Sequence, residues 1–243
     1  MSVPVVRILD IEGTTTSVGF VYDVLFAYAR QHVERFVEQA GDEPAARAAI
    51  ERLAADAAEE AARGESCPVV DRTTRSSEVA SVVAVVNWAM DRDRKTPGLK
   101  ALQGVIWQTG YLDGSLQSDV YDDVPLALRR WHESGARTVI YSSGSVAAQK
   151  LLFTHSRAGD LTPWLDGYFD TGVGPKREPA SYRRICAELG LEPGKALFVT
   201  DIVAEADAAV EAGLGVAIAV RPGNAPQPAH AYRVVTGFDK LEG

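Results

Sequence analysis

The chain has 243 residues, of which 46% are hydrophobic and 24% are charged. This balance excludes a disordered or fibrous chain, and the length suits one large domain or a core with a smaller inserted domain. Lys and Arg number 25 against 33 for Asp and Glu, so the formal net charge of −8 argues against nucleic acid or an anionic membrane as a partner.

The N-terminal segment lacks the charged region, the apolar run and the cleavage site of a signal peptide. The sequence also has no window that is apolar over the length of a membrane span. The two cysteines, Cys67 and Cys186, lie far apart and form neither a metal-ligand pair nor a disulfide-dense pattern. We therefore expect a cytoplasmic protein in a reducing compartment.

Four short apolar runs rich in β-branched residues predict buried parallel strands. Polar residues follow each run, and ligands of open α/β sheets bind beyond the carboxyl ends of the strands. We therefore expect these polar residues to converge on one crevice. The predicted strands span residues 5–9, 138–141, 196–199 and 216–220.

Helical patterns alternate with the last three of these strands, which is the rhythm of repeated βαβ units. The sequence therefore predicts an α/β fold with a doubly wound, Rossmann-like parallel sheet. Glycines follow three of the helical segments at positions where helices commonly end. The predicted helices span residues 124–134, 146–155, 180–189 and 204–212.

A stretch of more than a hundred residues separates the first predicted strand from the second, and helix formers dominate it. We predict that residues 19–119 form a helical cap inserted after the first strand. The Rossmann-like core is then discontinuous and consists of residues 1–18 and 120–243. Within the insert, we expect the Ala-rich, charged residues 44–63 to present a solvated helix face. We expect Trp88 and Trp107 to pack in its interior.

Two carboxylates stand two residues apart in the segment DIEGTT at residues 10–15, where the first predicted strand ends. Extended backbone places both on the same side. Such a pair is tolerable when a divalent cation lies between it and an incoming phosphate, so the pattern indicates Mg²⁺. Asp10 could then attack phosphorus, and Glu12 could protonate the leaving oxygen and later activate water. A polar strand end that enters a solvated loop is the alternative.

Hydroxyl and backbone N–H groups follow the second predicted strand at Ser142 and Ser143, ahead of a helix whose N-terminus favours anions. They suit a phosphate oxygen, although serines before a helix are also common N-caps. Lys176, on a loop with glycine and proline, could contact a phosphoryl oxygen as a point charge. A solvated lysine is the alternative there, and Arg177 is a competing cation.

Asp201 follows the third predicted strand, and Glu205 stands one helical turn further on. Asp201 is placed to be a further metal ligand, and Glu205 could coordinate directly or through water. An N-cap aspartate with an acidic first turn is the alternative. The order of carboxylate pair, hydroxyl, lysine and carboxylate, each at its own strand end or neighbouring loop, favours a phosphatase.

This succession resembles the haloacid dehalogenase-like hydrolases, whose motifs are a pair like Asp-x-Asp, a Ser or Thr, a Lys and an acidic cluster. Nearly the whole chain is similar to a narrower family, the enolase-phosphatases E1 or acireductone synthases of methionine salvage. Glu12, where most of the superfamily has Asp, is itself a mark of that family. The similar segments are DIEGTTTS at 10–17, DRKTPGLKALQG at 93–104, YSSGS at 141–145, QKLLF at 149–153 and VRPGNA at 220–225.

The resemblance implies a substrate, 2,3-diketo-5-methylthiopentyl-1-phosphate, which is enolised and then dephosphorylated to the acireductone. It implies one Mg²⁺ per subunit, held by Asp10, Glu12 and Asp201, with Glu12 contributing its backbone carbonyl. It implies a capped monomer that acts on a small-molecule phosphate ester, and it leaves open whether Glu205, which stands where Asp is common, touches the metal. The residues implied to bind substrate are Ser142, Ser143 and Lys176.

Three other functions fit part of the pattern. A metal-free dehalogenase would also use Asp10 as nucleophile, but Glu12 and Asp201 argue against it. A catalytically silent protein that binds a phosphorylated metabolite or a protein partner is a second alternative, and the complete set of acid, hydroxyl and lysine argues against it. A sugar-phosphate phosphatase of the same superfamily is the nearest alternative, because the phosphate motifs alone do not exclude it.

Glu12 is the candidate base for enolisation, as a hypothesis.

Overall fold

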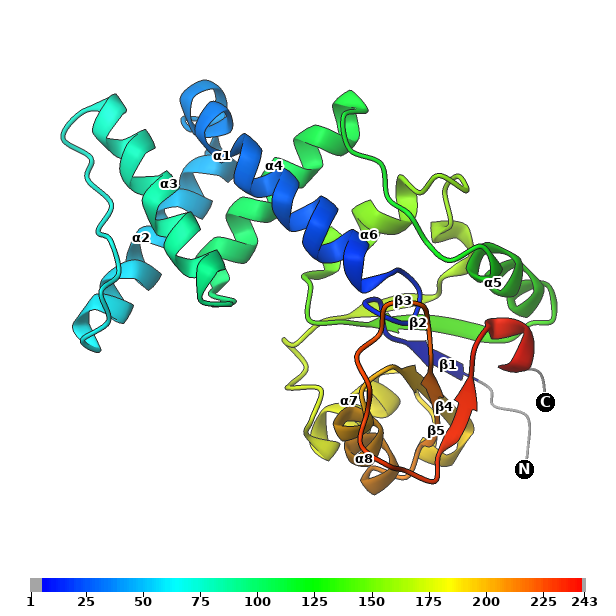
Figure 1. Ribbon diagram of the computed structural model, residues 1–243. Helices are drawn as coiled ribbons and strands as arrows, with labels where there is room; N and C mark the ends of the chain where they lie inside the picture. The colour runs from blue at the N-terminus through cyan, green and yellow to red at the C-terminus, as the bar shows by residue number, and fades with distance from the viewer. Residues whose placement is uncertain (1–5, 242–243) are drawn as a thin grey trace. The chain divides into compact units, whose positions relative to one another are not determined.

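The computed structural model describes residues 6–241 (Figure 1). Val5, the first residue of the first predicted strand, and the ends of the predicted core at residues 1–5 and 242–243 lie outside the described residues. The chain divides into two compact units, one formed by Met1–Tyr22 with Gln117–Gly243 and the other by Asp23–Leu116. Within the described residues, no helix combines the length and the hydrophobicity needed to cross a bilayer.

The first unit is built on a parallel sheet of six strands in the order β3-β2-β1-β4-β5-β6. The predicted α/β class with a doubly wound parallel sheet is therefore confirmed. Strands β3 and β6 were not predicted; each has three residues and lies at an edge of the sheet. The strands are β1 (Val6–Leu9), β2 (Arg137–Tyr141), β3 (Gly167–Phe169), β4 (Ala196–Thr200), β5 (Gly215–Ala219) and β6 (Arg233–Val235).

Four longer helices of this unit are found where they were predicted, and short 3₁₀ turns join some of the elements. The helices are α5 (Asp123–Glu133), α6 (Val146–Thr154), α7 (Pro179–Glu188) and α8 (Val203–Glu211), and the turns are η2 (Thr162–Trp164), η3 (Pro193–Lys195) and η4 (Phe238–Leu241).

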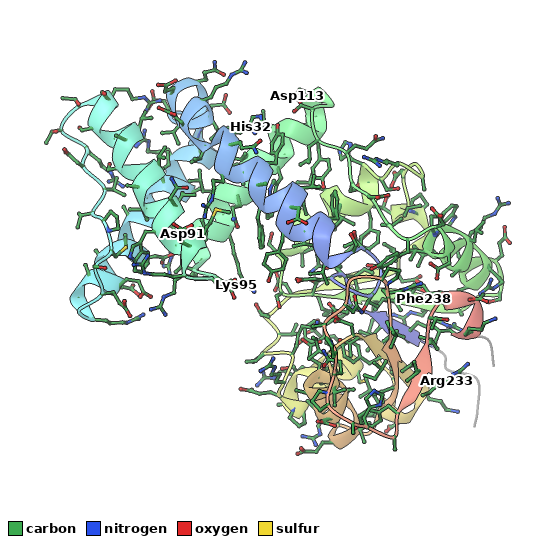
Figure 2. All side chains as sticks on the ribbon, viewed as in Figure 1. His32, Asp91, Lys95, Asp113, Arg233 and Phe238 are labelled. Carbon is green, nitrogen blue, oxygen red and sulfur yellow. The ribbon has the colours of Figure 1, made fainter. Side chains whose placement is uncertain are left out.

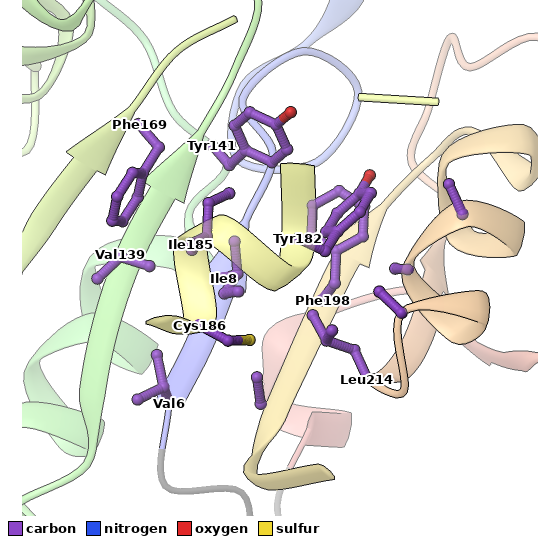
Figure 3. Close-up of a cluster of buried hydrophobic side chains, with 14 residues drawn as sticks. Val6, Ile8, Val139, Tyr141, Phe169, Tyr182, Ile185, Cys186, Phe198 and Leu214 are labelled. Carbon is purple, nitrogen blue, oxygen red and sulfur yellow. The ribbon is translucent and has the colours of Figure 1, made fainter. Parts of the chain in front are cut away.

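Residues of β1 alternate between the two faces of the sheet, as the strand period requires. Val6 and Ile8 join the core that α7 and α8 cover, together with Tyr182 and Phe198 (Figure 3). The guanidinium of Arg7, in between, lies 4.6 Å from the ring centroid of Trp131 in α5. Both faces of the central strand are thus buried, and three of its four residues are apolar.

The second unit is a helical one. It contains the last residues of the π-helix η1 (Phe20–Phe26) and four α-helices. Helix α2 packs on α4, and α1 packs on α3 and α4. Trp88 and Trp107 are buried in it, as predicted, and the indole N–H of Trp107 donates to the carbonyl of Leu25 at 2.8 Å. The helices are α1 (Ala27–Ala40), α2 (Pro44–Ala62), α3 (Arg75–Asp91) and α4 (Pro97–Asp113).

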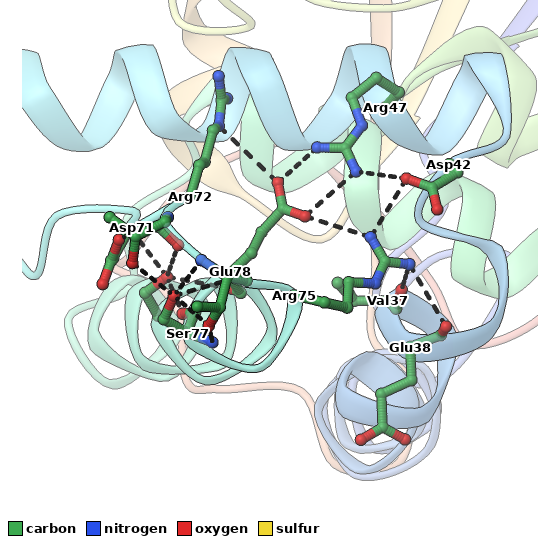
Figure 4. A network of polar contacts seen from close by, with 12 residues as sticks. Val37, Glu38, Asp42, Arg47, Asp71, Arg72, Arg75, Ser77 and Glu78 are labelled. Atoms are coloured by element: carbon green, nitrogen blue, oxygen red, sulfur yellow. Dashed lines mark hydrogen bonds and ion pairs between the residues drawn. The ribbon is translucent and has the colours of Figure 1, made fainter.

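A buried carboxylate organises the polar interior of the helical unit (Figure 4). Glu78 is 5% exposed, hydrogen-bonds Arg47 and lies 3.2 Å from the guanidinium of Arg75. Asp42 bridges the same two arginines at 3.0 and 3.3 Å. Hydrogen bonds from Arg47, which outweigh burial, hold the pKa of Glu78 below its usual value. The network fastens the start of α3 to the start of α2 by charge-assisted hydrogen bonds.

Helix α2 was predicted to present a solvated face, and its exposed positions do so, but its other face is buried and includes acidic residues. Asp56 is 5% exposed, accepts the N–H of Gly98 at 2.6 Å and pairs with Arg52 at 3.0 Å. It thereby satisfies a free N–H in the first turn of α4. Gly98 itself lies so close to the backbone of α2 that an added Cβ would stand 2.3 Å from the N atom of Leu53.

The two helices should therefore tolerate a methyl group at one glycine of α4 and not at another. We expect Gly98→Ala to lower the free energy of unfolding by about 1–3 kcal/mol, because the added Cβ overlaps the backbone of Leu53. Gly104→Ala is the matched control in the same helix. Its Cβ would meet no atom within 4 Å, so the higher helix propensity of alanine should raise stability by up to about 1 kcal/mol. Denaturant unfolding monitored by circular dichroism measures both, and equal effects would contradict this packing.

Candidate active site

Asp10 lies directly beyond the end of the central strand β1. Its backbone N–H donates to the carbonyl of Val199 in β4 at 2.9 Å, so the ladder extends to this residue. One carboxylate oxygen, Oδ1, accepts the N–H of Ile11 at 2.8 Å. The side chain is 6% exposed. The register of the sheet therefore fixes the carboxylate at the strand end where the sequence placed the nucleophile.

Lys176 pairs with two buried carboxylates. Its Nζ lies 2.6 Å from Oδ2 of Asp10 and 2.7 Å from Oε2 of Glu205, and the side chain is 7% exposed. Burial alone would lower the pKa of Lys176, but the charges of Asp10 and Glu205 outweigh it and raise that pKa above its ordinary value. The hydroxyl of Thr200 lies 2.8 Å from Oε2 of Glu205 and 3.2 Å from Oδ2 of Asp10. Lys176 is thus a buried, ion-paired lysine and not the solvated one that was the alternative.

The loop that carries Lys176 is held by side chains and has no regular secondary structure. Each of the four consecutive carbonyls of residues 173–176 accepts a hydrogen bond from a side chain at 2.6 to 2.8 Å. Gly174 and Lys176 are buried, and a buried carbonyl needs a partner, so these donors define the path of the loop. They are, in carbonyl order, Arg184, Tyr141, Ser181 and Tyr182.

The aromatic rings under this loop also support the ammonium. Tyr141, Tyr182 and Phe198 pack against one another, with centroids 5.0 to 6.4 Å apart (Figure 3). The Nζ of Lys176 lies 6.0 Å from the centroid of Tyr141 and 5.9 Å from that of Phe198. Burial raises the pKa of the Tyr182 hydroxyl, which therefore stays a hydrogen-bond donor.

Asp201 follows β4 and is 6% exposed. Burial, together with the charge of Asp10, raises its pKa to about 7. Its carboxylate lies against Gly13, whose φ is +67° and whose added Cβ would stand 2.4 Å from Oδ2 of Asp201. Only glycine fits this position, because a side chain would be strained in the left-handed region and would displace the carboxylate.

Glu12 lies in the tight turn that follows Asp10. The N–H groups of Thr14, Thr15 and Thr16 all point to the carbonyl of Ile11, at 3.2, 2.9 and 2.9 Å. Glu12 is half-buried and contributes to the raised pKa of Asp201. Among residues 6–241, no three His, Cys, Asp or Glu side chains are grouped so that they could hold a metal ion. The predicted ligand set requires only two side-chain carboxylates, because Glu12 was expected to offer its carbonyl.

Ser142 follows β2, the neighbour of β1 in the sheet. The residue is 9% exposed, and its hydroxyl accepts the N–H of Gly144 at 3.3 Å. Ser143 is exposed. The N-cap of α6 is Ser145, whose hydroxyl accepts the N–H of Ala148 at 3.3 Å. The capping alternative therefore applies to Ser145, and the two preceding serines do not cap that helix.

Arg221 is a buried residue near this site to which sequence reasoning gave no role. It makes two bonds to Asp123, at 3.0 and 2.9 Å, and its Nε donates to the carbonyl of Thr14 at 3.2 Å. The rings of Tyr121 and Phe238 lie 4.6 and 4.7 Å from its guanidinium (Phe238 is labelled in Figure 2). Its position directly after the predicted strand at residues 216–220 was the sequence feature that could have indicated a role for Arg221.

Comparison with known proteins places the chain in a family. Residues 7–213 match a family described as haloacid dehalogenase-like hydrolase. The chain is 45% identical to enolase-phosphatase E1 of Synechococcus elongatus, over 96% of each protein. It belongs to the enolase-phosphatase E1 family of haloacid dehalogenase-like hydrolases.

Two further relatives extend this assignment. The Populus trichocarpa protein named as a probable bifunctional methylthioribulose-1-phosphate dehydratase/enolase-phosphatase E1 is 45% identical, over 96% of this chain and 46% of that protein. The crystal structure of the UTR4 protein from Saccharomyces cerevisiae superposes with a TM-score of 0.77 at 32% identity, over 97% of this chain and 99% of that one. The enolase-phosphatase E1 assignment thus covers both units of the chain.

The hydrogen bond from Tyr182 to the carbonyl of Lys176 should contribute measurably to stability. We expect Tyr182→Phe to lower the free energy of unfolding by about 1–3 kcal/mol, because it leaves that buried carbonyl without its donor. Tyr168→Phe is the matched control, since within residues 6–241 the buried hydroxyl of Tyr168 has no hydrogen-bond partner. Its removal should be neutral or stabilising. Denaturant titrations of both variants decide, and a loss confined to Tyr168→Phe would refute this role of Tyr182.

Proposed function

We propose that this protein is a magnesium-dependent enolase-phosphatase of methionine salvage. Its substrate would be 2,3-diketo-5-methylthiopentyl-1-phosphate, which it would enolise and dephosphorylate to the acireductone. The observation that carries the proposal is the buried carboxylate of Asp10 at the end of β1, 2.6 Å from the ammonium of Lys176. The names of the similar proteins favour this substrate over a sugar phosphate.

In the proposed reaction, a carboxylate oxygen of Asp10 attacks phosphorus, and the bond from phosphorus to the ester oxygen breaks. The leaving oxygen takes a proton from the carboxylic acid of Glu12. Glu12, now a carboxylate, removes a proton from water, and the resulting hydroxide attacks the phosphorus of the aspartyl-phosphate and restores Asp10. The acid form of Glu12 arises earlier, when its carboxylate removes a proton from the carbon that bears the phosphate ester, next to the carbonyl, and leaves the enolate of the substrate. The products are therefore the dephosphorylated acireductone, as its enolate, and inorganic phosphate.

Asp10, Asp201 and the carbonyl of Glu12 are the proposed ligands of one Mg²⁺. These are hard oxygen donors, which this ion prefers. The pKa of Asp201, raised to about 7 by burial and by the charge of Asp10, supports a cation here because two buried carboxylates repel each other without one. A second feature that fits is the close packing of the Asp201 carboxylate on Gly13, the residue that follows Glu12, where an added Cβ would stand 2.4 Å from Oδ2. When bound, the ion supplies positive charge that neutralises the phosphate and the carboxylates.

Lys176, Ser142 and Ser143 are proposed to bind the phosphate. An ammonium has three N–H donors, and two of them point to Asp10 and Glu205, so the third can reach a phosphoryl oxygen. The contacts of Glu205 with Lys176 and Thr200 support a role for Glu205 in holding the lysine rather than the metal. We extend the proposal to a monomeric, cytoplasmic enzyme without nucleic acid or membrane partners.

The diketone phosphate itself provides the decisive assay. We expect enol absorbance to rise before free phosphate appears in the presence of Mg²⁺, and we expect EDTA to stop phosphate release because the carboxylates then repel the substrate. Asp10→Asn should reduce phosphate release by a factor of about 10³ or more, since an amide is no nucleophile. Phosphate without an enol intermediate would indicate a phosphatase of another kind, and activity unaffected by EDTA would indicate metal-free chemistry.

Glu12 is the proposed proton-transfer group in both halves of the reaction. Glu12→Gln keeps the backbone carbonyl for the metal and removes the titratable carboxyl. We expect this variant to bind Mg²⁺ normally, as measured by isothermal titration calorimetry, while both enol formation and phosphate release fall by a factor of about 10² or more. Normal accumulation of the enol in this variant would clear Glu12 of the first role and restrict it to phosphate transfer.

A further inference from the structure

Asn224 lies in the segment between β5 and β6, and its amide nitrogen is fully engaged. The Nδ2 group donates to the carbonyl of Gly13 at 2.9 Å and to the carbonyl of Ala219 at 3.2 Å. Because both partners are carbonyls, the nitrogen must face them, and the orientation of the amide is set. The side-chain oxygen therefore points away from both carbonyls.

That oxygen and the carboxylate of Asp201 both lie close to Gly13. Within residues 6–241 the Oδ1 atom of Asn224 is buried and has no hydrogen-bond partner. A Cβ on Gly13 would stand 3.0 Å from Oδ1 of Asn224 and 2.4 Å from Oδ2 of Asp201, so both oxygens pack against the same side of Gly13. Two acceptor oxygens cannot hydrogen-bond to each other, and a buried acceptor without a donor is unfavourable.

We infer that Oδ1 of Asn224 is a further oxygen of the cation site and accepts a hydrogen bond from the water shell of the bound Mg²⁺. Magnesium gives up its waters reluctantly, and groups that hold the waters and ligands of a metal commonly set its affinity. The same amide fixes the carbonyl of Gly13, next to Glu12. The inference rests on the cation site of the proposed function and adds a residue to it.

A purely structural role for Asn224 makes a different prediction. In that case the two hydrogen bonds from Nδ2 hold the segment after β5 in place, one of them to the loop after β1, and Oδ1 makes no contribution to Mg²⁺ binding. Loss of the Nδ2 donor alone would then be what matters. Asn224→Ala removes both the nitrogen and the oxygen. Asn224→Asp keeps an oxygen at the place of Oδ1 and adds negative charge, but it loses the donor to the carbonyls of Gly13 and Ala219. The pair of variants therefore separates the two roles.

The test is Mg²⁺ binding by isothermal titration calorimetry, with the rise in melting temperature on adding Mg²⁺ as a second readout; neither requires catalysis. We expect Asn224→Ala to weaken Mg²⁺ about tenfold or more, and Asn224→Asp to bind it as tightly as the unaltered protein or more tightly. Asn87→Ala is the matched control: the Oδ1 of Asn87 is also buried and without a partner within residues 6–241, but it belongs to the helical unit. The Asn87→Ala variant should bind Mg²⁺ with the affinity of the unaltered protein.

Equal affinity of Asn224→Ala and the unaltered protein would overturn the inference. Loss of affinity in Asn224→Asp as large as in Asn224→Ala would overturn it too, because the donor to Gly13 would then be what matters. If Asn224→Ala melts below the temperature of the titration, Asn224→Asp decides alone, with weaker binding refuting the inference and equal or tighter binding supporting it. Failure of the unaltered protein to bind Mg²⁺ would instead refute the proposed cation site as a whole.

Discussion

The candidate site depends on the buried ion pairs that the ammonium of Lys176 makes with Asp10 and Glu205. Removing one partner from a buried ion pair is strongly destabilising, so the three groups constrain one another. Asp201 adds a third carboxylate close to this cation, and burial, together with the charge of Asp10, raises its pKa to about 7. Burial and the charge of Asp10 also raise the pKa of Glu205. The fold therefore concentrates acidic groups at the strand ends beyond what its own lysine balances, and a divalent cation would complete the balance.

Sequence patterns predicted the strands that carry most of their own signal. Strands β1, β2, β4 and β5 are buried apolar runs, and such runs are visible without knowledge of their neighbours. Strands β3 and β6 have three residues each, too few for a pattern, and they exist because the sheet offers them an edge to pair with. The buried acids of α2 were missed for a related reason. Asp56 caps α4 from another part of the sequence, and composition cannot show a long-range partner.

The positions of the site residues could be predicted because each follows a strand or precedes a helix. Sequence reasoning placed Asp10, Lys176 and Asp201 at strand ends and loops, and the sheet brings them close together. Which carboxylate Lys176 contacts could not be predicted, because that depends on a loop whose path is set by Tyr141 and Tyr182 through their hydroxyls. A tyrosine in an apolar pattern indicates a core position and does not reveal which carbonyl its hydroxyl reaches.

The loop after β1 is the point at which the chain leaves the core for the helical unit. Its carbonyls at Gly13 and Thr14 are held by Asn224 and Arg221, which belong to the far end of the sequence. These bonds come from the unit that contains Asp10, so they do not depend on the inserted helices. The helical unit has its own buried charge network around Glu78. A long insertion can therefore follow the nucleophile directly without loosening it, because the loop is anchored to the core before the chain departs.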